Sequence, residues 1–133
     1  MTPFEYRHTL RVRYRECDAQ GHVFFAEYPA YLDVAITELW RERAGGWQAM
    51  VDSGHDLVVG EVSCRYIGSA VFDDLIDVVL TVSRLGETSM TTDWRVERGS
   101  DVLVTGVVRH VCIDPETHLK KPLPSELRTV FAA

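Results

Sequence analysis

Cysteine is scarce in this chain of 133 residues. Only Cys17, Cys64 and Cys112 are present, widely spaced and odd in number. Such a set does not form a disulfide framework and is typical of a reducing compartment, so we expect a cytoplasmic protein. No apolar run approaches the roughly 20 residues that a membrane span needs. The first residues also lack the apolar stretch of a secretory signal, so we expect neither a membrane span nor export.

Basic residues are also few. The chain has 14 Lys and Arg against 20 Asp and Glu, which gives a net charge of -6. Binding to nucleic acids or to anionic membranes relies on clustered Lys and Arg, so we expect neither as a partner. Hydrophobic residues make up 46% of the chain and charged residues 26%, ordinary values for a globular protein. At this length we expect one domain, residues 1–133, with a substantial core.

Several motifs of common catalytic and nucleotide-binding sites are absent as well. The chain has no G-x-S-x-G, no P-loop and no G-x-G-x-x-G. The five His residues show no H-x-x-x-H spacing and the cysteines no C-x-x-C spacing, so we expect no metal site. Cys17 adjoins Asp18 but has no evident His–Asn partner, which predicts a buried, inert thiol rather than a nucleophile.

The chain does contain a clear change of periodicity near its beginning. Residues 6–14 alternate and predict a strand, and residues 16–22 break the alternation with a loop that contains Gly21. Helical spacing then predicts a helix over residues 25–44, which Gly45 and Gly46 would end. The unpaired N–H groups at the start of this helix should point back toward Asp18. The apolar stripe of the helix comprises Tyr28, Tyr31, Leu32, Ala35, Ile36, Leu39 and Trp40.

The second half of the chain is rich in β-forming residues. We predict strands over residues 57–66, 76–84, 90–97 and 102–113, with a connector that contains a helical turn at residues 47–54. One early strand, one long helix and a run of antiparallel strands indicate an α+β domain in which the sheet wraps the helix.

The segment from Asp18 to Tyr28, Asp-Ala-Gln-Gly-His-Val-Phe-Phe-Ala-Glu-Tyr, resembles the signature of one family. It is similar to that of the hotdog-fold acyl-CoA thioesterases of the 4-hydroxybenzoyl-CoA thioesterase and YbgC-like group. In that signature an Asp precedes Gly by three positions, and a Val–aromatic pair and usually Asn-Tyr follow. Here Glu27 stands in the place of the Asn. Weaker similarities extend the resemblance over residues 5–128.

The resemblance implies a hotdog fold, in which an antiparallel sheet wraps one long central helix. It also implies hydrolysis of an acyl-CoA thioester without a metal or redox cofactor, coenzyme A being part of the substrate. Proteins of this group form homodimers or homotetramers, with active sites at the subunit interface. We therefore expect residues of a second subunit to complete the pocket.

The resemblance also implies roles for residues of the motif. Asp18 would act as a general base on water or as a direct nucleophile, and the sequence leaves both open. The Phe25 amide would bind the developing oxyanion, and Gly21 would let the loop approach the substrate closely. His22 could polarise the substrate or a water, although a structural hydrogen bond is the commoner role of such a residue. Asp18 itself could instead be only a turn residue.

The substrate-binding residues are expected around the same loop. Tyr14, Phe24, Phe25, Tyr28 and Tyr31 predict an apolar pocket for aromatic or short-to-medium aliphatic acyl groups. Further candidates for contacts with the acyl group, the pantetheine arm and the nucleotide are Tyr28, Glu61, Ser63, Arg65, Tyr66, Arg84, Thr88, Ser89 and Met90.

Two other functions stay open. One is a hotdog hydratase or dehydratase, although His22 is followed by Val-Phe-Phe rather than by the Phe-Pro that such enzymes favour. The other is a non-catalytic module that binds acyl-CoA, against which the acidic Asp18 argues.

Overall fold

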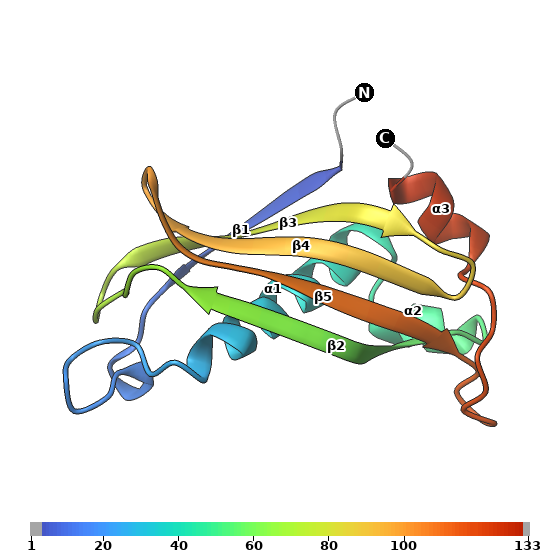
Figure 1. The fold of residues 1–133 in the computed structure, drawn as a ribbon. Coiled ribbons are helices and arrows are strands. Elements are labelled where there is room, and N and C mark those ends of the chain that lie inside the picture. Colours follow the sequence, from blue (N-terminus) through green and yellow to red (C-terminus); the bar gives the residue numbers. More distant parts are fainter. Residues whose placement is uncertain (1–3, 132–133) are drawn as a thin grey trace.

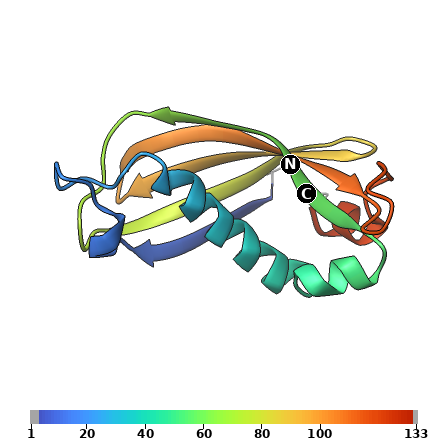
Figure 2. The ribbon, with the colours of Figure 1, turned by 90° about the horizontal axis from the view of Figure 1, so that it is seen from below.

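The computed structural model is a five-stranded antiparallel sheet with one long helix across one of its faces (Figures 1 and 2). It describes residues 4–131. The elements are, in chain order, β1 (Glu5–Arg11), a short 3₁₀ turn (Tyr14–Glu16), α1 (Glu27–Arg43), α2 (Trp47–Asp52), β2 (Asp56–Tyr66), β3 (Leu75–Leu85), β4 (Ser89–Arg98), β5 (Asp101–Ile113) and α3 (Ser125–Phe131). The predicted α+β hotdog architecture is confirmed.

The strands follow the order β1-β3-β4-β5-β2, so β1 and β2 form the two edges of the sheet. Neighbouring strands are antiparallel throughout. Residues that alternate along each central strand face α1 and are buried, as a sheet with one covered face requires. All seven apolar residues of the predicted helical stripe are buried against them. The residues of β3 and β4 on this face are Ile76, Val78, Leu80, Val82, Met90, Thr92, Trp94 and Val96.

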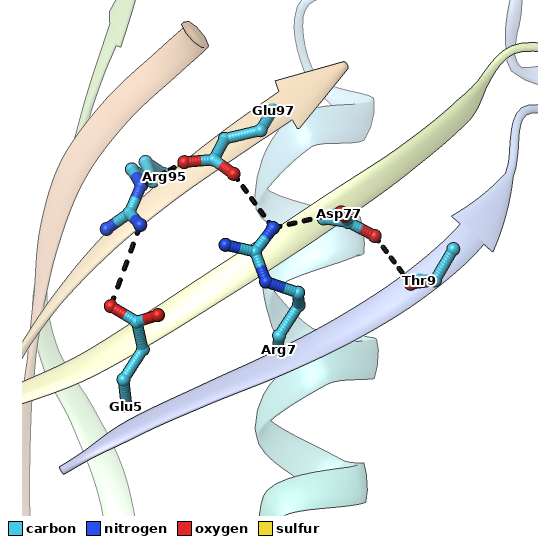
Figure 3. A network of polar contacts seen from close by, with 6 residues as sticks. All are labelled: Glu5, Arg7, Thr9, Asp77, Arg95 and Glu97. Atoms are coloured by element: carbon cyan, nitrogen blue, oxygen red, sulfur yellow. Dashed lines mark hydrogen bonds and ion pairs between the residues drawn. The ribbon is translucent and has the colours of Figure 1, made fainter. Parts of the chain in front are cut away.

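The opposite face of β1, β3 and β4 carries a network of charged residues (Figure 3). Arg7 on β1 bonds Asp77 on β3 at 2.9 Å and Glu97 on β4 at 2.8 Å. Arg95 also pairs with Glu97, and these hydrogen bonds from Arg95 and Arg7 lower the pKa of Glu97. Exposed ion pairs of this kind contribute little stability individually, but this network links three neighbouring strands of the sheet.

The first predicted strand was too long at its C-terminal end. β1 ends at Arg11, and Tyr14, which we expected inside the strand, begins the 3₁₀ turn with 78% of its surface exposed. The cause is Glu16, whose buried carboxylate accepts hydrogen bonds from the backbone N–H and the Nε–H of Arg13 and thereby turns the chain.

The helical predictions differ from the structure at their boundaries. α1 begins at Glu27 rather than at Phe25, because the chain first makes a turn in which the Glu27 N–H bonds the Phe24 carbonyl at 2.9 Å. It ends at Arg43, one residue before the predicted end. The connector contains α2, as predicted. We did not predict α3, which packs its Phe131 ring against Trp40.

Candidate active site

The loop between the 3₁₀ turn and α1 is a tight hairpin centred on Gly21. The Asp18 N–H donates to the His22 carbonyl at 2.8 Å, and the Gly21 N–H donates to the Asp18 carbonyl at 3.0 Å. Gly21 has φ of 82°, a conformation that a side chain disfavours. Cys17 and Val23 pair across the hairpin. Cys17 is half-buried rather than fully buried as expected, with its Sγ 3.9 Å from the Arg13 carbonyl oxygen.

Glu16 holds the base of this hairpin. Its side chain is only 3% exposed and accepts a hydrogen bond from the Tyr31 hydroxyl of α1 at 2.9 Å, besides those from Arg13. Burial alone would raise the pKa of Glu16, but the hydrogen bonds from Arg13 and Tyr31 outweigh it and the pKa is lowered. The carboxylate is therefore charged at neutral pH, and it fixes the hairpin to α1.

A second loop, residues 67–74, lies beside the hairpin. The Val23 N–H donates to the Ala70 carbonyl at 2.9 Å. Asp74 accepts hydrogen bonds from the Val71 N–H and from Arg98, each at 2.9 Å. Hydrogen bonding thus joins the two loops to each other and to β4.

The hairpin, the start of α1 and the second loop enclose a hollow of about 440 Å³. In it the Asp18 Oδ1 accepts hydrogen bonds from the N–H groups of Gln20 at 2.9 Å and His22 at 3.3 Å. Within residues 4–131, the other carboxylate oxygen of Asp18 has no hydrogen-bond partner, and the Phe25 N–H donates no hydrogen bond. The hollow is lined by Asp18, Gln20, His22, Val23, Phe25, Tyr28, Tyr66, Gly68 and Ser69.

Two tyrosines fix the helix start within this hollow. The Tyr66 hydroxyl donates to the Phe25 carbonyl at 2.9 Å, and the buried Tyr28 hydroxyl accepts from the Ala70 N–H at 3.0 Å. Partial burial and the neighbouring Cys64 side chain raise the pKa of Tyr66 to about 12, so the hydroxyl keeps its proton at neutral pH. The Tyr66 ring contacts the rings of Phe25 and Tyr28, and the three side chains form an aromatic wall.

A separate, apolar groove lies between α1 and β2. It encloses about 360 Å³. Tyr28 of α1 lines the hollow, and the next residue, Pro29, lines the groove. The groove extends along α1 as far as Trp40, a helix rise of roughly 16 Å. Its walls are formed by Pro29, Leu32, Asp33, Ile36, Thr37, Trp40, Trp47, Leu57, Val59, Val62, Val108 and His110.

The structure thus brings part of the predicted site together. Asp18, His22, Phe25, Tyr28 and Tyr66 line one hollow, and Gly21 forms the turn of its hairpin. Gln20 and Val23 belong to the motif but received no role in the site, and nothing in the sequence pointed to Gly68 or Ser69. Val23 reads as an ordinary apolar residue, and Gln20, Gly68 and Ser69 as turn residues.

The other candidates lie elsewhere in the same chain. Ser63 and Arg65 line a separate hollow of about 540 Å³ over β2, β4 and β5, and Glu61 is exposed on β2. The β3–β4 turn lies beside α3, at the opposite end of the sheet from the Asp18 hairpin (Figure 1). Any contact from this turn to the site would have to come from a second copy, which stays a prediction. The candidates in and beside this turn are Arg84, Thr88, Ser89 and Met90.

A carboxylate with a free oxygen and an unpaired amide in the turn before a helix suit attack on a carbonyl. The carboxylate can activate water or attack directly, and the amide can stabilise the oxyanion. Among residues 4–131, no group of three His, Cys, Asp or Glu side chains is placed to hold a metal ion. No helix of the same residues is long and apolar enough to cross a membrane.

Comparison with known proteins identifies the family. Residues 20–105 match the family model of the thioesterase superfamily, a match that begins two residues after Asp18. The chain is 28% identical over 127 residues to the acyl-CoA thioester hydrolase YbgC of Escherichia coli O6:H1, covering 95% of each chain. It is 24% identical over 129 residues to a 1,4-dihydroxy-2-naphthoyl-CoA hydrolase of Synechococcus elongatus, covering 93% of each.

Solved structures give the same result for the fold. A 1,4-dihydroxy-2-naphthoyl-CoA thioesterase from Synechocystis superposes with a TM-score of 0.88 at 20% identity, over 97% of this chain and 96% of that one. The chain therefore belongs to the thioesterase superfamily, and it is an enzyme that hydrolyses thioesters.

Proposed function

We propose that the enzyme hydrolyses coenzyme A thioesters of aromatic or short-to-medium aliphatic acyl groups. The observation that carries the proposal is the hollow in which the free carboxylate oxygen of Asp18 and the unpaired amide of Phe25 occur together. The names of the relatives, which include an acyl-CoA and an aromatic acyl-CoA hydrolase, support coenzyme A as the carrier.

In the proposed reaction the thioester carbonyl lies against the Phe25 N–H. Asp18 takes a proton from water as the water attacks, or attacks the carbonyl itself to form an acyl anhydride that water then opens. In the first route the proton taken up by Asp18 passes to the departing sulfur and coenzyme A leaves as the thiol. In the second route coenzyme A leaves as the thiolate. One preorganised donor such as the Phe25 amide is typically worth about 3 kcal/mol to the oxyanion. The residues need no metal or cofactor for these steps.

The apolar groove beside the hollow supports the proposed acyl preference. Apart from Asp33, Thr37 and His110, its walls are apolar or aromatic. Asp33 is exposed at its rim and would repel an acyl group that carries a negative charge. Both features favour uncharged acyl groups.

A panel of thioesters tests the function and the preference together. We expect benzoyl-CoA and hexanoyl-CoA to be hydrolysed with a higher kcat/KM than malonyl-CoA and succinyl-CoA. The assay measures the free thiol that is released, and mass spectrometry identifies the products. Faster turnover of the two dicarboxylic thioesters would show that the acyl pocket is polar. Addition of water to an enoyl-CoA without release of thiol would indicate a hydratase. Binding of acyl-CoA without any reaction would indicate a non-catalytic module that binds acyl-CoA.

We also propose that the enzyme works as a homodimer or homotetramer joined at β2. Within residues 4–131 this strand of 11 residues has no partner along its outer edge, and long exposed edges normally pair or carry protection. On it Val59 is 57% and Val62 is 47% exposed. A cytoplasmic location stays a prediction, with which the free cysteines agree.

A substitution that places a charged side chain on the β2 edge tests whether the subunits are joined there. Val58 on β2 is 39% exposed and lines neither the hollow nor the groove. We expect Val58→Asp to shift the protein toward the monomer in light scattering and to lower kcat, because an interface of paired apolar edges disfavours a carboxylate. Leu119→Asp, at an exposed apolar residue of the C-terminal segment, is the control and should change neither. A wild-type protein that stays a monomer at micromolar concentration with full activity would contradict the shared site.

A further inference from the structure

One buried residue of the second loop links the two halves of the candidate active site. Ala70 is completely buried, its N–H donates to the Tyr28 hydroxyl at 3.0 Å, and its carbonyl accepts from the Val23 N–H at 2.9 Å. Val23 lies in the chain between Asp18 and the Phe25 amide, whereas Tyr28 lies in the first turn of α1. The place of Ala70 therefore determines how the hairpin sits against the start of the helix.

A single arginine holds the residues on both sides of Ala70. Arg98, the last residue of β4, donates from its Nη1 to the Ser69 carbonyl at 3.1 Å and to the Asp74 Oδ2 at 2.9 Å. The same carboxylate oxygen accepts a hydrogen bond from the Val71 N–H at 2.9 Å. The turn after β4, the second loop and the hairpin lie at the same end of the sheet (Figure 1). The residues before and after Ala70 are thus tied to one guanidinium group.

The contact between Arg98 and Asp74 is an ion pair at neutral pH. Burial alone would raise the pKa of Asp74, but the hydrogen bonds from the Val71 N–H and from Arg98 outweigh it, and the pKa is lowered. The side chain of Arg98 is nevertheless 37% exposed and that of Asp74 is 21% exposed. Partly exposed pairs contribute little to the free energy of unfolding. We therefore expect the fold to form without this pair, and the effect of the pair to lie in where it holds the loop.

We propose that Arg98 is a positioning residue for the hydrolysis. By holding the residues on both sides of Ala70, it fixes the separation between the Asp18 carboxylate and the Phe25 amide. The roles of Asp18 and Phe25 are those of the proposed function, on which this inference rests. Arg98 does not line the hollow, so it acts through the loop rather than on the substrate. Displacement of a catalytic group by about 1 Å can cost on the order of a hundredfold in rate, which makes such a contact important for turnover.

Removal of the guanidinium group tests the role of Arg98. We expect Arg98→Met, which keeps an unbranched aliphatic stem, to lower kcat by about one to two orders of magnitude. KM should change less than about threefold, because a displaced carboxylate weakens stabilisation of the transition state rather than binding of the substrate. Arg95→Met, on the same strand but in the charged network on the face away from α1, is the matched control and should leave kcat unchanged. Wild-type kcat in a folded Arg98→Met variant, or an equal loss in Arg95→Met, would overturn the proposal.

Two further variants distinguish positioning from general damage to the fold. Arg98→Lys carries an ammonium group that can donate to both acceptors, so its kcat should lie closer to that of the wild type than the kcat of Arg98→Met does. In Asp18→Asn the carboxylate is already lost, so adding Arg98→Met should lower the residual kcat by a smaller factor than it lowers the kcat of the wild type. Equal kcat in the Lys and Met variants, or full multiplication of the two losses in the double variant, would refute a role through Asp18.

Amide hydrogen exchange gives a readout that does not depend on hydrolysis. The N–H groups of Ala70 and Val23 should exchange faster in Arg98→Met than in the wild type, whereas that of Val79, buried in β3 between two paired strands, should stay protected. Unchanged exchange at Ala70 and Val23 would show that Arg98 does not hold the loop and would overturn the proposal. If Asp18→Asn keeps wild-type kcat, it is the proposed function that fails, and the exchange rates still decide whether Arg98 fixes Ala70.

Discussion

Replacing Asp18 with Asn is expected to lower kcat by about two orders of magnitude or more while the fold stays intact. The amide can neither accept a proton from water nor attack a carbonyl. Its oxygen can still accept the hydrogen bonds that Asp18 Oδ1 receives from Gln20 and His22, so the hairpin should keep its shape. The measurement is kcat with the best thioester of the panel, together with circular dichroism and Tm.

Cys17→Ala is the control for this substitution. It changes the neighbouring residue, which we place outside the chemistry, and should leave kcat near the wild-type value. An Asp18→Asn variant that folds normally and keeps wild-type kcat would reduce Asp18 to a turn residue. Turnover in isotopically labelled water separates the two mechanisms, since heavy oxygen in the Asp18 carboxylate would mark it as the nucleophile.

The sequence predicted the regular elements well because their periodicity is strong. The helical stripe from Tyr28 to Trp40 named seven residues, and all of them are buried. The strands of the second half lie within one residue of the expected bounds at each end, since turns with Gly86 and Gly99 separate them. The alternation of apolar and polar residues follows directly from which positions are buried, so a single sequence is enough to predict these elements.

The site was only partly predictable, because it depends on contacts between distant segments. Tyr66 reaches the Phe25 carbonyl across 41 positions of the chain. Gly106 leaves room for Trp94, whose Nε1 donates to the Ser63 carbonyl at 3.2 Å, and neither residue carries a local signal of this contact. Arg98 is an ordinary charged residue beside the end of a predicted strand, and its contacts with the second loop become visible only in three dimensions.

Glu16 shows the same limit most clearly. In the sequence it is one more acidic residue of a polar loop, where a solvated side chain is the default. In the structure it is buried between Arg13 and Tyr31 and determines where the first strand ends. The hairpin that carries Asp18 therefore depends on a carboxylate whose importance no local pattern reveals.

We expect Glu16→Ala to destabilise the enzyme by roughly 2–4 kcal/mol, because it leaves the buried Tyr31 hydroxyl and the Arg13 N–H without their acceptor. The ion pair with Arg13 adds little to this sum, since the Arg13 side chain is 64% exposed. The corresponding fall in Tm is on the order of 10 °C. Glu116→Ala, at an exposed carboxylate, is the matched control and should change Tm little.

A double-mutant cycle with Tyr31→Phe identifies the cause of the loss. Once the Tyr31 hydroxyl is gone, Glu16→Ala no longer leaves it unpaired, so the double variant should be more stable than the sum of the single effects predicts. Strict additivity would mean that the hydrogen bond between Glu16 and Tyr31 contributes nothing.

The pH dependence of Tm gives an independent check on the contribution of Glu16. Because the pKa of Glu16 is lowered in the folded state, its contribution is present above the unfolded pKa of about 4.3 and is lost as the pH falls below it. The difference in Tm between wild type and Glu16→Ala should therefore be constant near neutral pH and shrink in acid.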